Sequence, residues 1–203
     1  MSLRILPFRQ YAEEDVVNLY RVADGAELDS TTGTGTGDAG VFVKVAGGDF
    51  SLDPVSYSTD NYLGKTDYPH VGRAQYPKVN LTVEAATTGA AVLGITLLQT
   101  AKADENGEKL LYNPQKALEL QAALPGQAVP VATKGVFTLA DTAVDGTLTP
   151  GAKFSISANA GKITGCAVDS AYALGTVLGS GSRTTQNGTA DQFDGSYYVI
   201  KLG

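Results

Sequence analysis

At 203 residues, the chain is long enough for one large domain or two small ones, each with a hydrophobic core. Its 15 Lys and Arg residues against 21 Asp and Glu residues give a formal net charge of −6, which disfavours broad electrostatic binding to nucleic acid or to an anionic membrane. One Cys excludes a disulfide within the chain, and a hydrophobic fraction of 43% argues against wholesale disorder. We expect neither nucleic acid nor a membrane among its partners.

The N-terminal residues predict an extended arm over 1–12. Pro7 opposes a helix, and the short apolar run around it is typical of a strand that adds to the sheet edge of a neighbouring molecule. An internal first strand of the chain's own fold would use the same residues and is the alternative. The stretch lacks the apolar segment and cleavage site of a secretory signal, so we expect a soluble product of the cytoplasm. The candidate partner-binding residues of this arm are Leu3, Arg4, Ile5, Phe8, Arg9 and Tyr11.

Residues 13–124 predict a β-rich domain. The segment 16–22 favours a strand, with a short helix behind acidic residues as the alternative. Low-complexity residues 30–40 predict a flexible loop, because almost no apolar side chain offsets the entropy of ordering them. A strand follows over 41–45, and then a long Tyr-rich loop that includes 57–76. Its several Tyr side chains suit a contact surface, with the rim of the core as an equal alternative.

The second half of this region contains two further strands, a hairpin and one helix. Alternating apolar and polar residues predict strands over 76–84 and 91–99, and Asn106-Gly107 between two extended runs predicts a hairpin. Pro114 after Asn113 is typical of a helix start, and an apolar stripe of Ala117, Leu120 and Leu124 extends the predicted helix over about 114–124. Pro125-Gly126 ends it, and 125–130 is a predicted linker.

The C-terminal region, 131–203, predicts a small β-barrel or sandwich domain. Short β-prone runs alternate with Gly-rich turns, and a polar loop over 180–196 precedes the last run. The whole chain is therefore predicted to be mainly β with one short helix. The five expected strands are 136–139, 153–156, 161–164, 174–178 and 197–202.

No constellation of residues predicts catalysis, a cofactor or a metal. Gly35–Gly40 has the letters of a dinucleotide-binding fingerprint, but it precedes a strand instead of following one. His70 and Cys166 would be the pair of a thiol enzyme, yet each is better explained structurally, His70 as a loop residue and Cys166 as a small buried strand residue. The acidic run 104–108 offers oxygen ligands without the spacing of an EF-hand, and a hairpin tip explains it better.

The C-terminal region resembles the small β-domain of tailed-bacteriophage head decoration (cement) proteins. The segments that carry this resemblance are Gly135-Val136-Phe137-Thr138-Leu139, Gly151-Ala152-Lys153-Phe154, Gly161-Lys162-Ile163-Thr164, Leu174-Gly175-Thr176-Val177-Leu178-Gly179 and Tyr198-Val199-Ile200-Lys201-Leu202. The resemblance implies a non-enzymatic virion protein, made in the cytoplasm of the host bacterium. It would bind the major capsid protein at capsomer junctions on the outside of the head, as a homotrimer. The alternatives are a phage tail or fibre component, and a carbohydrate-binding or adhesin-like β module that uses the 57–76 loop.

Overall fold

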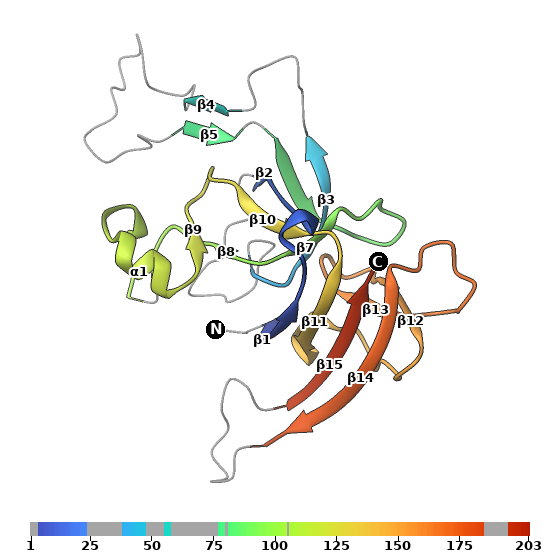
Figure 1. Ribbon diagram of the computed structural model, residues 1–203. Coiled ribbons are helices and arrows are strands. Elements are labelled where there is room, and N and C mark those ends of the chain that lie inside the picture. Colours follow the sequence, from blue (N-terminus) through green and yellow to red (C-terminus); the bar gives the residue numbers. More distant parts are fainter. Residues whose placement is uncertain are drawn as a thin grey trace.

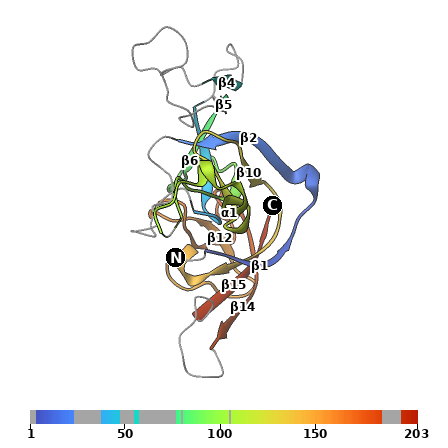
Figure 2. The same ribbon diagram turned by 90° about the vertical axis from the view of Figure 1, so that its left-hand side faces the viewer.

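The computed structural model of the chain describes residues 4–23, 38–47, 55–57, 77–79, 81–104, 106–184 and 195–203. Within them the protein is mainly β with one short α-helix, which confirms the predicted fold class. A closed barrel lies in the middle of the molecule, and a six-stranded sheet extends from it toward the lower end of the view (Figure 1). The small β4–β5 pair lies at the opposite end, and the view turned by 90° shows the same arrangement (Figure 2).

Five strands form the barrel. All neighbours pair antiparallel except β2 and β6, which run parallel. The predicted strand over 16–22 is confirmed with the same bounds, and the one over 41–45 corresponds to β3. Around the barrel the order is β10 (Val129–Ala132), β2 (Val16–Val22), β6 (Thr82–Ala85), β3 (Phe42–Gly47) and β7 (Gly94–Thr96).

The six-stranded sheet contains every strand that the sequence predicts after residue 131. These strands do not close on themselves: the closed barrel is built from β10 and four strands that precede it, and the C-terminal strands instead join the N-terminal β1 in one antiparallel sheet. Across the sheet the order is β1 (Ile5–Gln10), β11 (Gly135–Ala140), β15 (Gly195–Leu202), β14 (Gly175–Arg183), β12 (Lys153–Ile156) and β13 (Ile163–Cys166).

The remaining elements are short. The predicted strands over 76–84 and 91–99 are each divided into two, and the hairpin at Asn106-Gly107 is confirmed by an antiparallel bridge between Ala103 and Lys109. The elements are β4 (Val55–Tyr57), β5 (Pro77–Val79), β8 (Gln99–Thr100), β9 (Ala122–Ala123), the α-helix α1 (Pro114–Glu119), and the 3-10 helices η1 (Glu13–Asp15), η2 (Leu110–Tyr112) and η3 (Asp141–Ala143).

The helix is shorter than its apolar stripe predicts. It starts at Pro114 as expected but ends at Glu119, five residues before the predicted end. Gln121 has a φ of 49°, a left-handed conformation that cannot continue a helix. The chain then turns into β9, which pairs with β8, and the Gln99 amide donates a hydrogen bond of 2.8 Å to the Leu120 carbonyl oxygen. Tertiary pairing with β8 therefore overrides the helical periodicity of the sequence.

The end of the predicted flexible loop is ordered. Residues 30–37 lie outside the described residues, but Asp38 is only 4% exposed and Gly40 packs against Ile5. The Thr96 hydroxyl donates to the Asp38 carbonyl oxygen at 2.9 Å and accepts the backbone N–H of Val41 at 3.1 Å. This corner is therefore part of the core. The composition of residues 30–40, which lack large apolar side chains, predicts a flexible loop there instead.

The barrel and the sheet share one hydrophobic core. Phe42 of the barrel and Phe154 of the sheet are both fully buried, with ring centroids 6.3 Å apart in an edge-on arrangement. The turn at Gly161, between β12 and β13, also packs on the barrel: its N–H donates to Ala86 O at 2.8 Å and its carbonyl accepts the Phe42 N–H at 3.2 Å. Strand pairing crosses the proposed domain boundaries at both β1 and β10, and the division into domains stays a prediction.

Candidate partner-binding groove

Strand β1 is the last strand of the six-stranded sheet. It pairs with β11 through Ile5↔Leu139 and Arg9↔Phe137, and the irregular register between these pairs lies around Pro7. No other strand of the sheet lies on its outer side. Pro is tolerated on such an edge because it has no N–H to donate to a neighbouring strand. The predicted arm is thus a strand of the chain's own fold, and no described strand pairs with its outer edge.

The structure divides the predicted arm residues into two groups. Ile5 is buried in the shared core and Arg4 is nearly buried, so these two serve the fold. Phe8 is 63% exposed, and Arg9 and Tyr11 point to the same side of β1, as residues two apart on a strand do. Leu3 lies outside the described residues.

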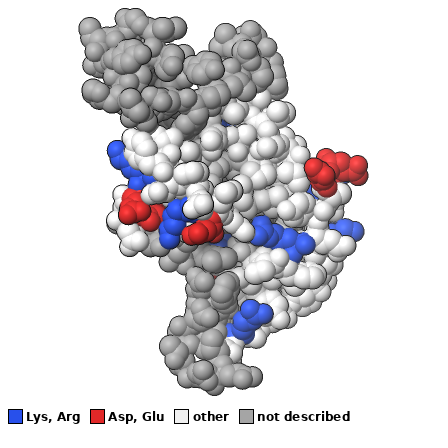
Figure 3. All heavy atoms as spheres, turned by 60° about the vertical axis from the view of Figure 1, so that its left-hand side comes forward, with Lys and Arg blue, Asp and Glu red and all other residues white. Residues whose placement is uncertain are grey.

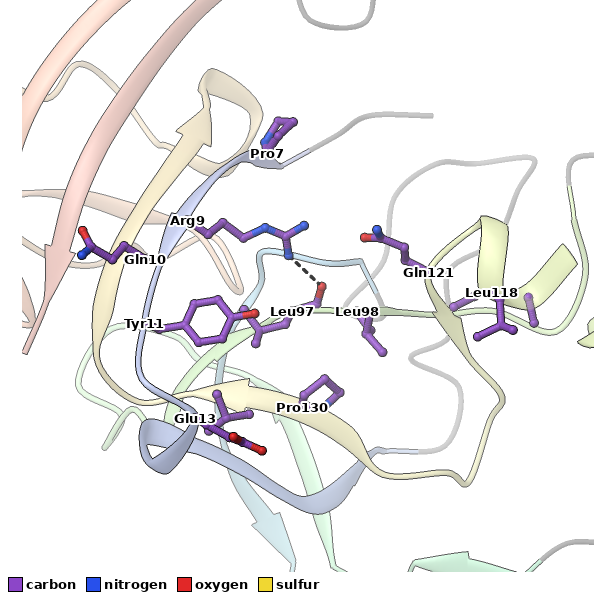
Figure 4. Close-up of a pocket in the computed structure, with 13 residues that line it drawn as sticks. Pro7, Arg9, Gln10, Tyr11, Glu13, Leu97, Leu98, Leu118, Gln121 and Pro130 are labelled. Carbon is purple, nitrogen blue, oxygen red and sulfur yellow. Dashed lines mark hydrogen bonds between the residues drawn. The ribbon is translucent and has the colours of Figure 1, made fainter. Parts of the chain in front are cut away.

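Arg9 and Tyr11 line a groove of about 940 Å³ (Figure 4). One wall is β1, and the facing wall is formed by α1 and the segment that follows it. Between the walls lie the residues just before β8 and the start of β10. The groove is thus built by four separate segments of the chain. Its other lining residues are Pro7, Gln10, Glu13, Val16, Leu97, Leu98, Ala117, Leu118, Gln121, Ala122 and Pro130.

The groove combines an apolar lining with one cation. The Arg9 guanidinium donates a long hydrogen bond of 3.4 Å to the Leu97 carbonyl oxygen, and the described residues give it no carboxylate partner. Glu13 lines the same groove, and Figure 4 draws no interaction between it and Arg9. On the face shown in Figure 3, the described surface is mostly uncharged, with small separate groups of acidic and basic side chains.

A buried ion pair fixes the start of β1. Arg4 Nε lies 3.2 Å from Asp38 Oδ2, and both side chains are almost wholly shielded from water. Burial raises the pKa of Asp38 from 3.8 to about 6, although the neighbouring Arg4 guanidinium lowers it. The pair therefore joins the start of β1 to the corner before β3. The Arg4 charge favours the ionised carboxylate and offsets part of the desolvation cost of burying it.

The other candidate residues are not brought together into a site. His70 and the 58–76 part of the Tyr-rich loop lie outside the described residues. Cys166 is a free thiol on β13 and is partly exposed, not buried as expected. Asp104 is buried because its Oδ1 accepts the N–H groups of Asn106 and Glu108 at 2.9 and 2.8 Å, which organises the hairpin tip. Among the described residues, no three His, Cys, Asp or Glu side chains form a metal-binding group.

Sequence reasoning found one wall of the groove and missed the other. Arg9 and Tyr11 are candidates because they belong to the arm that could add to the sheet edge of a neighbouring molecule. Leu98, Leu118 and Gln121 are not candidates, because Leu98 falls in the predicted strand over 91–99 and the other two fall in the predicted helix over about 114–124. Leu118 is 79% exposed.

The chain was also compared with known proteins. No protein-family model, curated protein or solved structure matches it. No helix in the described part of the chain is long and apolar enough to cross a membrane.

Proposed function

We propose that the chain is a non-enzymatic structural virion protein that binds the outer surface of a phage head at capsomer junctions and stabilises the shell. The observation that carries the proposal is the arrangement of the segments resembling decoration proteins. Those segments correspond to β11, β12, β13, β14 and β15, and all five belong to one sheet. The resemblance therefore concerns one spatial unit and not scattered strands.

The position of β1 adds a second line of support. It extends that same sheet by one strand and carries Phe8 and Arg9, and Tyr11 follows it, stacked on Phe137 with ring centroids 6.0 Å apart. Exposed aromatic and Arg side chains are enriched at protein–protein interfaces. A sheet with a contact surface on its edge strand suits a protein that attaches to a larger assembly.

A trimer is the proposed form of attachment. Local threefold positions of an icosahedral shell match a threefold-symmetric partner, and three modest contacts on one rigid trimer act together. Attachment at capsomer junctions would then oppose the separation of capsomers under internal DNA pressure.

Co-sedimentation with shells tests this proposal. Purified protein is titrated onto expanded shells assembled from the major capsid protein of the same genome, and the bound fraction is measured after pelleting. The proposal predicts saturable binding at a fixed ratio of three chains for each occupied threefold position. A folded protein that stays in the supernatant, and forms rings or fibres in the electron microscope, would favour the tail component instead. Glycan binding without shell binding would favour the carbohydrate-binding module.

A further inference from the structure

The groove between β1 and α1 has features of a specific peptide site. We propose that it binds an extended segment of the capsid protein that places an acidic side chain against Arg9 and an apolar side chain against Leu98 and Leu118. This inference rests on the proposed function, because it takes the major capsid protein as the partner. The volume of about 940 Å³ lies within the range of known ligand sites, and the groove is open to solvent, which suits a peptide segment laid along it.

The charge of Arg9 selects the acidic side chain. The guanidinium has five N–H donors, and among the described residues it makes one hydrogen bond, the long contact with Leu97 O. A half-buried cation beside an apolar wall is incompletely solvated, and a carboxylate can accept two parallel hydrogen bonds from it. An incoming Asp or Glu would therefore supply the carboxylate partner that no described residue gives to Arg9.

The backbone at Gln121 points to the same place. Its φ of 49° is a conformation that glycine adopts far more readily than glutamine, and it follows a helix end where glycine is the usual residue. The Gln121 amide nevertheless reaches across the groove toward Arg9 from the opposite wall (Figure 4). Because the amide faces the guanidinium, it can donate a hydrogen bond to the same carboxylate that Arg9 binds.

The remaining lining explains why the partner is a peptide and not a polyanion. Arg9 is the one Lys or Arg among the residues that line the groove, whereas nucleic acid requires several cations in a row. Leu118 is 79% exposed on the rim and gains most from burial against an apolar side chain.

Two substitutions separate binding from folding. Arg9→Gln removes the charge, and its matched control is Arg183→Gln, which removes an exposed arginine from the far end of β14. Gln121→Gly removes the amide and relieves the backbone strain, so its melting temperature should stay level or rise. In the shell titration we expect both groove variants to bind roughly tenfold to a hundredfold more weakly, as loss of a charge-assisted hydrogen bond predicts, with the control unchanged.

A carbodiimide cross-link identifies the acidic partner directly. Arg9→Lys places an amine at the same position, and the reagent joins amines to carboxylates that touch them without a spacer. The inference predicts a covalent link from position 9 to an Asp or Glu of the capsid protein in decorated shells. A link to Glu13 of the same chain instead would overturn it.

The outcomes distinguish the inference from the proposed function. Shell binding by the wild type with equal binding by Arg9→Gln and Gln121→Gly would overturn the groove assignment and leave the decoration role standing. Failure of the folded wild type to bind shells at all would overturn the decoration role, and the inference with it.

Discussion

The buried carboxylate of Asp38 should make the stability of the protein depend on pH in an unusual direction. Its pKa is raised from 3.8 to about 6 in the folded protein, with burial as the main cause. As pH rises above 3.8, the unfolded chain releases this proton while the native protein still holds it. The native state therefore loses relative stability until the pH passes about 6, and above that the contribution is constant.

The size of the effect follows from the two pKa values. Their difference, at about 1.4 kcal/mol for each pH unit, amounts to about 3 kcal/mol in the free energy of unfolding. Most of this change falls between pH 4 and pH 6. Asp38 is only 4% exposed, so solvent screens its charge less than that of a surface carboxylate.

Asp38→Asn isolates this contribution, because an amide does not titrate. We would measure urea unfolding by circular dichroism from pH 4 to pH 8 for wild type and variant, and subtract the two free energies at each pH. The wild type should lose about 3 kcal/mol relative to the variant as pH rises, whatever constant offset the lost contact with Arg4 adds. Asp169→Asn, at an exposed position, controls for the change in net charge. A difference that is independent of pH, or that favours the wild type at high pH, would refute the reasoning.

Three further predictions concern the core. Gly161→Ala should lower the free energy of unfolding by roughly 2 kcal/mol or more in urea denaturation, because an added Cβ would lie 2.4 Å from Val41 Cγ1 at a φ of +71°. The control Gly151→Ala has a similar φ of +84° but open space around the added Cβ, and it should cost only about 1 kcal/mol. Phe154→Ala should cost about 3–5 kcal/mol, and calorimetry should show one transition for barrel and sheet together; two separate transitions would contradict a shared core. Thr96→Val should cost about 1–3 kcal/mol by chemical denaturation, since it removes two buried hydrogen bonds to the corner before β3; an unchanged midpoint would show that this corner carries no stability.

The strands were the most predictable part of the fold. Residues 153–156 form β12 with the predicted bounds, because short β-branched and aromatic runs between Gly-rich turns define a strand locally. The helix end was not predictable from periodicity, since the left-handed residue Gln121 and the pairing of β9 with β8 depend on the rest of the molecule.

Long-range pairing was the part that the sequence did not reveal. β1 finds its partner β11 more than a hundred residues later, and nothing in either segment specifies that choice over a neighbouring molecule. Asp38 falls in the loop that its composition predicts to be flexible. It is ordered by the ion pair with Arg4, a contact that the local sequence does not show. The groove was predicted in part for the same reason. Arg9 belongs to the predicted arm, whereas Leu118 and Gln121 are brought beside it only by long-range folding of the chain.

The most direct test of the decoration role is a cryo-electron microscopy reconstruction of expanded shells saturated with the protein. The account predicts added density at the local threefold positions on the outer surface, with three chains in each and the β1 edge turned toward the shell. Shells without added density at saturating protein, or density confined to a tail vertex, would contradict it.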